Sequence, residues 1–384
     1  MTLCINPSCP QPEEPLNNGR LHCLHCGSPL VFNEGYRAIA LLQEDDLSKL
    51  YELRDDLGCS QVLQVLSVEN PRAISLLQQQ ARVLALADHP GVPTVEPDGY
   101  LNLYPNDDSR SVIHALAMEK IDGMTLGEWF QGQNSQPIAE RIALDWLGQL
   151  VEILDCLHRH LYFHRDIRPQ NIRVRENGTL ALVNFGSFRD VAIAYLVSQT
   201  RSLVPHPREI ETLHSVSAGY TPREQVQGKG VPQSDFFALG RTWVYLLTGK
   251  PPTDFPEDPR TGELLWQHRA SHISPDFIDL LDWMMSPRAS DRPHSAAAIL
   301  SPLQRLVSQR CEFQPISTSL KARSRDGSTR LSRSDRAKSS KFKAVLLWGG
   351  SLMLLSAIAT RVDWSSLVKA IAPHVEFESE QQSP

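Results

Sequence analysis

The sequence lacks several features that would assign it to a class of protein at once. Its first residues are polar and rich in cysteine and proline, so no secretory signal is expected there. It has no internal repeat of fixed period, which removes repeat architectures from consideration. The formal net charge is −6, so overall charge gives no reason to expect nucleic-acid binding. The 384 residues, 41% hydrophobic and 21% charged, are typical of a soluble globular body with two or three domains.

Cysteine is scarce except near the N-terminus. The chain has seven cysteines, and four of them lie within the first 26 residues: Cys4, Cys9, Cys23 and Cys26. The Cys-x-x-Cys spacing of the second pair lets two thiolates meet one tetrahedral ion. Several prolines in this segment argue against regular structure, and bound zinc would supply the folding energy directly. We therefore predict a structural zinc site at these four cysteines, with His22 and His25 as spare ligands. The alternative is a set of reduced or redox-active thiols.

The segment 163–171 reads Phe-His-Arg-Asp-Ile-Arg-Pro-Gln-Asn, and it follows an apolar helix expected over residues 139–160. This segment resembles the catalytic loop of eukaryotic-type protein kinases, His-Arg-Asp-x-x-x-x-Asn. The resemblance implies an α+β, two-lobed protein-kinase-like fold. It implies that Asp166 accepts a substrate hydroxyl proton, that Asn171 ligates magnesium, and that Arg168 replaces a lysine that steadies the phosphoryl group. The alternative is a polar turn between a helix and a strand.

The glycine-rich motif that covers the nucleotide phosphates in this family is missing. Aligned with the family, residues 41–51 form its strand-loop-strand without a gap, but the three glycines become Gln43, Asp45 and Ser48. Glycine lets the backbone approach the phosphates closely, and these side chains prevent that approach. We also expect Asp45 and Asp46 to direct negative charge at the phosphate oxygens.

The ion pair that positions the phosphates is also missing. The strand expected over 60–66 carries Gln64 at the position of the family's lysine, and the helix expected over 73–87 carries Gln80 at that of its glutamate partner. Two amides can hydrogen-bond each other, so we predict a strut without an ion pair. In the with-no-lysine kinases, a lysine from the glycine-loop strand takes over this role, and Lys49 is an alternative of that kind. The matching position is Ser48, however, and one step along a strand turns the side chain to the other face.

Other motif positions are mixed. Met118 stands at the gatekeeper position, and Glu119 and Ile121 lie in the hinge, whose backbone would contact adenine. Asn184 replaces the metal-binding aspartate of Asp-Phe-Gly, and its carbonyl oxygen is a weaker magnesium ligand than a carboxylate. Binding of ATP and magnesium therefore stays open.

The framework motifs are intact. Glu224 is expected to pair with Arg292, and Asp235 to brace the catalytic loop. The long segment before Tyr220 is polar over residues 200–211, which favours a mobile loop.

The cysteine-rich segment and the domain after it are similar to the bacterial four-cysteine-prefix serine/threonine kinases, over roughly the first 300 residues. The resulting domain prediction places a zinc-binding prefix at 1–35, an N-terminal lobe at 36–120 and a C-terminal lobe at 121–310.

The C-terminal residues predict a membrane tether. Residues 321–343 hold nine Lys or Arg and two acidic residues, which indicates a disordered basic linker over 311–343. Residues 344–360 are uncharged, and as a helix they would extend roughly 26 Å, just short of a hydrocarbon core of about 30 Å. The positive flank predicts a single span with the kinase-like body in the cytoplasm and a short tail at 361–384 outside it. The alternative is a buried amphipathic helix.

Together these features predict a membrane-tethered pseudokinase that binds a protein partner, because several charged parts of the nucleotide site are lost at once. The first alternative is an active, divergent serine/threonine kinase that acts on a protein substrate. The second is a zinc-linked redox or metal sensor.

Overall fold

A computed structural model describes residues 1–32, 35–45, 47–105, 111–185 and 219–312. Residues 1–311 form one compact unit. The predicted mobile loop at 200–211, the linker beyond residue 312, the apolar run 344–360 and the tail 361–384 lie outside the described residues. Within the described ranges, none of the helices combines the length and the apolarity that crossing a bilayer requires. The membrane span therefore stays a prediction.

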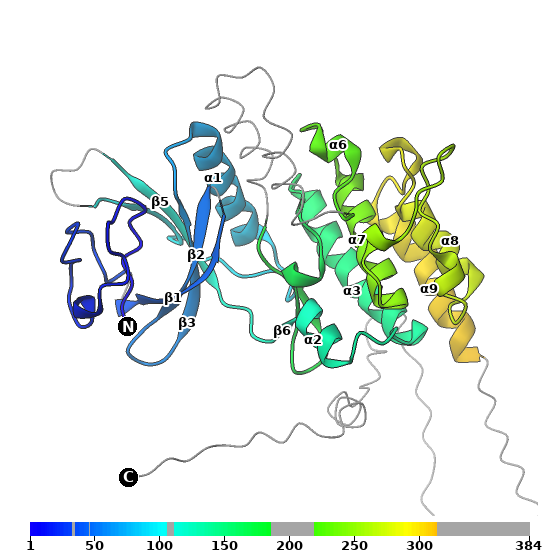
Figure 1. Cartoon of the computed structure of the whole chain (residues 1–384), viewed down its shortest axis with the longest axis horizontal. Coiled ribbons are helices and arrows are strands. Elements are labelled where there is room, and N and C mark those ends of the chain that lie inside the picture. Colours follow the sequence, from blue (N-terminus) through cyan, green and yellow to red (C-terminus); the bar gives the residue numbers. More distant parts are fainter. Residues whose placement is uncertain (33–34, 46, 106–110, 186–218, 313–384) are drawn as a thin grey trace, which may run out of the picture. The chain divides into compact units, whose positions relative to one another are not determined.

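The N-terminal lobe is an antiparallel sheet with one long helix against it (Figure 1). The strands are β1 (Arg37–Glu44), β2 (Ser48–Arg54), β3 (Ser60–Leu66), β4 (Tyr100–Leu103) and β5 (Ile113–Glu119), in the order β1-β2-β3-β5-β4. Helix α1 (Pro71–Leu86) begins where the Asn70 side chain accepts hydrogen bonds from the backbone N–H groups of Arg72 and Ala73. The strand expected over 60–66 and the helix expected over 73–87 are thus present.

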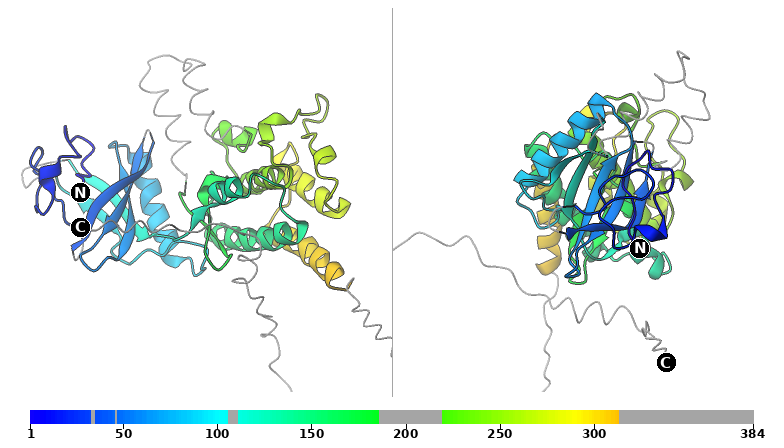
Figure 2. Two further views of the ribbon diagram at one scale, coloured as in Figure 1. Left: turned by 60° about the horizontal axis from the view of Figure 1, so that its bottom comes forward. Right: turned by 90° about the vertical axis from the view of Figure 1, so that its left-hand side faces the viewer.

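The two faces of this sheet have different neighbours. Successive side chains of a strand point to opposite faces. In β3, Leu63 and Val65 pack with Leu3 and Ile5 of the N-terminal loops, which lie in front of the sheet in the right-hand view of Figure 2. Gln64 faces the other way, toward α1, where it contacts a side chain of that helix. One layer of strands therefore separates the N-terminal loops from the space behind the sheet.

The C-terminal lobe is mainly helical (Figure 1). Its helices are α2 (Leu126–Gly132), α3 (Glu140–Arg159), α6 (Arg223–Val226), α7 (Pro232–Thr248), α8 (Pro275–Met284) and α9 (Ala296–Glu312). Three short strands, β6 (Met124–Thr125), β7 (Ile172–Val174) and β8 (Leu180–Leu182), form a second sheet. The core centres on α3 and α7, where Leu150 and Trp243 are fully buried. The helix expected over 139–160 is α3. The short strands place the loop 163–171 at the edge that faces the N-terminal lobe.

Candidate active site and metal centre

A cavity of about 390 Å³ lies between the N-terminal sheet and the second sheet. Its walls include the apolar side chains of Leu42, Leu50 and Val62 from the N-terminal lobe and of Val183 and Phe185 from the C-terminal lobe. Six residues with side-chain amides also line it: Gln43, Gln64, Gln80, Gln170, Asn171 and Asn184. The predicted hinge residues Met118, Glu119 and Ile121 border the same cavity. The structure thus brings the predicted nucleotide-site residues together in one cleft.

The loop 163–171 is anchored to helix α7 by one buried carboxylate, that of Asp235. Asp235 of α7 accepts hydrogen bonds from the backbone N–H groups of His164 at 2.9 Å and Arg165 at 2.8 Å. His158 Nε2 lies 2.8 Å from the same side chain. Burial alone would raise the pKa of Asp235, but its contact with His158 brings that pKa below its ordinary value. The expected brace of the catalytic loop is therefore present, and His158 adds a contact that sequence reasoning did not identify.

The three predicted catalytic residues lie side by side at the cleft. Asn171 Nδ2 donates hydrogen bonds to both the backbone oxygen and the Oδ2 atom of Asp166, each at 2.7 Å. Arg168 Nε lies 3.3 Å from Asp166 Oδ2. The Asp166 carboxylate is therefore held in place by an amide and a guanidinium.

Gln64 and Gln80 form the amide pair that the sequence predicts. Gln80 Nε2 donates a 3.0 Å hydrogen bond to Gln64 Oε1, and both side chains are buried. The contact joins α1 to β3, where the family resemblance implies a glutamate–lysine pair. The connection between helix and strand is thus kept, while the positive charge that would face a phosphate is absent.

Asn184 joins the two lobes through its side chain. Its Nδ2 atom lies 3.1 Å from Gln43 Oε1 of β1 and 3.1 Å from Asn171 Oδ1, and it donates to both. The residue has φ of 59°, a left-handed conformation that asparagine tolerates better than most residues. The chain of contacts from Gln43 through Asn184 and Asn171 reaches Asp166. Sequence analysis treated Gln43 only as a lost glycine, and it missed this contact.

The expectation for Asp45 is wrong in its direction. The Asp45 carboxylate accepts hydrogen bonds from the backbone N–H groups of Leu47 at 3.0 Å and Ser48 at 2.7 Å, and from the Ser48 hydroxyl at 3.0 Å. It therefore points into its own turn between β1 and β2. An aspartate side chain commonly accepts hydrogen bonds in a turn from the backbone N–H groups two or three residues later in the chain. The Asp-x-x-Ser spacing could therefore have indicated this turn.

Lys49 faces away from the cleft. In the register of β2 and β3 it pairs with Val65, which packs against the N-terminal loops, whereas Leu50 pairs with Gln64. Its Nζ atom lies 2.8 Å from Glu44 Oε1. This position matches the expectation that one step along the strand turns the side chain to the other face, and it does not favour a catalytic role.

The magnesium ion that the resemblance implies does not fit these residues. Magnesium is bound in proteins mainly through carboxylates and water in near-octahedral geometry. Asn184 offers no carboxylate, and its NH₂ group faces Asn171 Oδ1. The nearby Asp166 carboxylate already contacts Asn171 and Arg168. Asn184 and Asn171, which stand at the two positions implied to hold magnesium, are neutral amides that hydrogen-bond each other.

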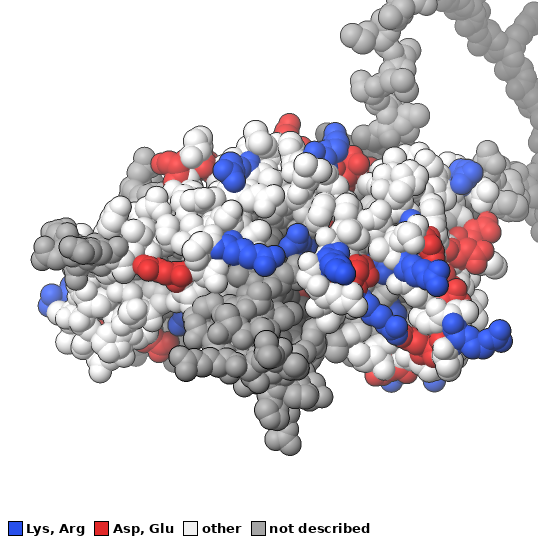
Figure 3. Space-filling model, turned by 90° about the horizontal axis from the view of Figure 1, so that it is seen from above, with Lys and Arg blue, Asp and Glu red and all other residues white. Residues whose placement is uncertain are grey.

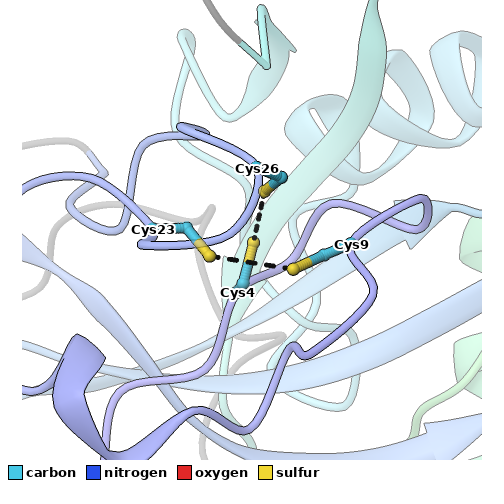
Figure 4. Close-up of side chains that lie close together, drawn as sticks. All are labelled: Cys4, Cys9, Cys23 and Cys26. Carbon is cyan, nitrogen blue, oxygen red and sulfur yellow. Dashed lines mark hydrogen bonds between the residues drawn. The ribbon is translucent and has the colours of Figure 1, made fainter.

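The four predicted zinc ligands come together in the N-terminal loops (Figure 4). Their sulfur atoms all lie within 4.8 Å of one another. The Sγ atoms of Cys4 and Cys26 are 3.5 Å apart, and those of Cys9 and Cys23 are 3.7 Å apart. A tetrahedral zinc ion with Zn–S distances of about 2.3 Å requires sulfurs about 3.8 Å apart, whereas a disulfide requires about 2.05 Å. The donor set therefore fits zinc.

The pKa values of two of these thiols are shifted in opposite directions. Burial raises the pKa of Cys9 to about 11. Burial would also raise that of Cys23, but the backbone N–H groups of Cys26 and His25 and the Asn17 side chain lower its pKa to about 6. The His25 ring lies 3.0 Å from Glu14 Oε2, so this spare ligand is engaged elsewhere.

The cysteine cluster is attached to the N-terminal sheet through Cys4 itself. Cys4 lies between Leu3 and Ile5, whose side chains belong to the core of the sheet, while its own sulfur belongs to the cluster. Leu3 also donates a backbone hydrogen bond to Ala38 of β1 at 2.8 Å. Tyr51 of β2 lies in the same core, and burial raises its pKa to about 12. The cysteine cluster and the sheet thus share one backbone segment.

The predicted framework pair is present. Arg292 Nη1 lies 2.6 Å from Glu224 Oε1, and the Arg292 side chain is fully buried. Arg292 also donates to the backbone oxygens of Ser286 and Pro287. Burial alone would raise the pKa of Glu224, but the hydrogen bond from Arg292 brings it below the ordinary value.

The outer surface carries both signs of charge. Figure 3 shows Lys and Arg side chains in a short row across the middle of one face, with acidic side chains on either side of that row. Charge alone therefore does not mark out one class of partner on this face.

Comparison with known proteins gives the following relatives. The family model described as "Protein kinase domain" matches residues 100–303. "Serine/threonine-protein kinase B" of Synechocystis sp. is 28% identical over 79% of this chain and 52% of its own length. "Serine/threonine-protein kinase PknA" of Nostoc sp. is 31% identical over 61% of this chain and 40% of its own length. The chain spans about half or less of the length of these relatives.

The solved structure of the "PpkA-294 apo form" aligns with this chain at a TM-score of 0.51 and 23% identity. The alignment covers 71% of this chain and 96% of that one. This likeness shows the fold, and with the family match it confirms the expected two-lobed, α+β protein kinase architecture.

Proposed function

The chain belongs to the protein kinase domain family, and from that premise we propose that it is a pseudokinase. In this proposal it is a serine/threonine-kinase-like protein that acts by binding a protein partner. The observation that carries the proposal is the network of neutral amides in the cleft. Gln64 and Gln80 bond each other, and Asn184 bonds Gln43 and Asn171.

The physical argument concerns charge. Phosphoryl transfer depends on positioning and on stabilising the charge of the transferred group with cations. The described cleft offers amides where the family resemblance implies a lysine, a glutamate and a metal-binding aspartate. Asp166 can accept a proton, but it has nothing to act on unless a γ-phosphate is held in line with the substrate hydroxyl.

The test is phosphate transfer from ATP to a generic protein substrate by the full chain, with magnesium. We expect the unmodified chain and an Asp166→Ala variant to be indistinguishable. The missing parts act as a unit, so Gln64→Lys alone should not restore transfer. The combination of Gln64→Lys, Gln80→Glu and Asn184→Asp is the first variant with which recovery can be expected. Transfer by the unmodified chain that disappears in Asp166→Ala would overturn the proposal.

An active, divergent kinase is the second candidate, and one observation favours it. Asp166, Arg168 and Asn171 are in mutual contact at the cleft, as a working catalytic loop would require. The printed names of the relatives call those proteins serine/threonine-protein kinases. The same transfer assay separates the two candidates.

We also propose how the parts of the chain are used. Residues 1–35 are a zinc-binding prefix of the bacterial four-cysteine-prefix kind, and the sulfur distances support this assignment. The N-terminal lobe covers 36–120 and the C-terminal lobe 121–310. The basic linker 311–343, the uncharged run 344–360 and the tail 361–384 tether the kinase-like body to a membrane from its cytoplasmic side. Support for the tether comes from composition.

A further inference from the structure

We propose that the cleft selects an uncharged, planar ligand of nucleoside size over its phosphorylated forms. This inference rests on the proposed function, because a cleft that transfers no phosphate has no need to bind one. It goes further by naming the class of ligand. Four features of the described cleft carry it: the character of its lining, its occupied donors, an unpaired acceptor and its apolar walls.

The inner lining of the cleft is neutral. The charged lining residues Glu119, Lys120 and Asp122 belong to the hinge, and Arg173 donates to the hinge-side oxygen of Gly123. The rest of the polar lining is amide. The nearest carboxylate behind it, Asp166, would repel an anion placed beside Asn171. An anionic group in this part of the cleft would lose its hydration, and the guanidinium behind it, that of Arg168, is already paired with Asp166.

The donors that could replace that hydration are already in use. Asp46 lies outside the described residues, and among the described residues of the turn between β1 and β2, which the family alignment places over the phosphates, the backbone N–H groups of Leu47 and Ser48 are the available donors. Both donate to the Asp45 carboxylate instead. The turn therefore contains its own anion. A phosphate would have to displace this carboxylate and would also meet its negative charge. The NH₂ group of Asn184 is likewise shared between Gln43 and Asn171.

One acceptor in the cleft has no partner. Gln80 Oε1 is buried and accepts no hydrogen bond from any described residue, and the Gln80 side chain is 1% exposed. A buried acceptor without a donor destabilises the structure that contains it. Gln80 lines the cavity but its Oε1 atom is itself covered, so a ligand with an N–H or O–H donor would satisfy this atom once the side chain turns toward the cavity. The unpaired acceptor therefore favours a ligand group with an N–H or O–H donor at this point, and an ionised phosphate group, which has only acceptors, would not satisfy it.

The walls favour a flat ring system. Leu42, Leu50 and Val62 line the cavity from the N-terminal lobe, and Val183 and Phe185 line it from the C-terminal lobe. Apolar walls with a few convergent polar groups are the usual form of a small-molecule site, and a volume of about 390 Å³ lies in the usual range. A heteroaromatic ring with an attached neutral polar group matches both the walls and the amides.

Calorimetric titration of the full chain with adenosine, ADP and ATP tests the proposal, each with and without magnesium. We expect adenosine to bind about tenfold more tightly than ADP, and magnesium to change neither affinity. Tighter binding of ADP or ATP than of adenosine would overturn the proposal. Failure to bind adenosine, or a gain in affinity on adding magnesium, would overturn it as well.

Two pairs of variants locate the selectivity. Asp45→Ala frees the turn donors and removes the charge, whereas Asp45→Asn keeps the cap and removes only the charge. Both should reduce the preference for adenosine over ADP, by about fivefold or more. Gln80→Leu should weaken adenosine binding about tenfold, whereas Gln78→Leu, at an exposed position of the same helix, should not. Unchanged selectivity in both Asp45 variants would contradict the proposal even if Gln80→Leu did not fold.

The two proposals can fail separately. Observed phosphate transfer would remove the pseudokinase assignment. Preferential ADP binding without any transfer would remove only the ligand assignment and leave the pseudokinase assignment in place.

Discussion

Gln80 Nε2 lies 3.0 Å from Gln64 Oε1, and this amide pair joins helix α1 to strand β3 in a buried position. It occupies the position at which the family resemblance implies an ion pair. A neutral pair keeps the geometric connection without the desolvation of two charges. The consequences can be measured as stability, without any assay of activity.

Gln80→Glu alone should destabilise the fold by about 2–4 kcal/mol, because it places an uncompensated carboxylate in a buried site. Gln64→Lys alone should be destabilising for the same reason, and the double variant should recover most of the loss. Denaturant unfolding of the four proteins gives the interaction energy as a double-mutant cycle. Gln78→Glu, at an exposed position of α1, serves as the control and should change stability by less than about 0.5 kcal/mol. Additive effects of the two buried substitutions would contradict the pairing.

The purified chain should carry about one zinc ion, because four sulfur atoms converge at tetrahedral spacing. Elemental analysis after preparation under reducing conditions without chelator measures it. The variant Cys23→Ser/Cys26→Ser should lose the metal, and Cys59→Ser, an exposed cysteine outside the cluster, should keep it. Zinc content equal in all three proteins would remove the site.

Arg292→Met should destabilise the C-terminal lobe by about 3–5 kcal/mol, because it leaves the Glu224 carboxylate without its buried partner. Arg223→Met is the matched control. Arg223 lies next to Glu224 on α6 and forms an exposed ion pair with Glu257. Its replacement should cost less than about 1 kcal/mol of stability.

The same pair predicts a dependence of stability on pH. The pKa of Glu224 is lowered in the folded protein, so the unfolded state binds the proton more readily. The contribution of the pair is therefore fully present above the unfolded pKa of about 4.3 and is lost as pH falls through the lower, folded value. Unfolding curves of the unmodified chain and Arg292→Met should converge in this acidic window. A constant difference down to the lowest pH would be inconsistent with this assignment.

The full chain should fractionate with membranes and resist carbonate extraction, whereas a chain ending at Arg336 should be soluble. The reason is the uncharged run 344–360 after the basic linker. Fractionation followed by immunoblotting measures both chains. Identical behaviour of the two would show that residues 337–384 do not anchor the protein.

The elements that depend on local pattern could be predicted from the sequence. Helices α1 and α3 follow from apolar periodicity and strand β3 from the family resemblance, and each was found within two residues of its expected bounds. The Gln64–Gln80 contact was also predictable, because the resemblance placed both residues at positions that face each other.

Contacts between distant polar side chains could not be predicted in this way. The hydrogen bond from Asn184 to Gln43 joins residues 141 positions apart, and no local pattern specifies it. The prediction for Asp45 failed for a different reason. Its signal is local, but alignment with a phosphate-binding loop directed attention to an absent ligand instead of the neighbouring N–H groups. The packing of Leu3 and Ile5 on the sheet could be seen only in the structure. The alternation of side chains around Cys4 indicates that these residues and Cys4 face opposite ways, but it does not indicate what each of them contacts.

A single layer of strands separates the cysteine cluster from the cleft, so adjacent residues of β3 face two different parts of the molecule. Gln64 projects into the cleft, whereas Leu63 and Val65, one position away on either side, project toward the prefix. A conservative substitution at one of these positions would perturb the packing on one side of the sheet only, and moving it by one residue would transfer the perturbation to the other side. Neighbouring residues of one strand can thus be used to probe the cleft and the cysteine cluster separately within the same molecule.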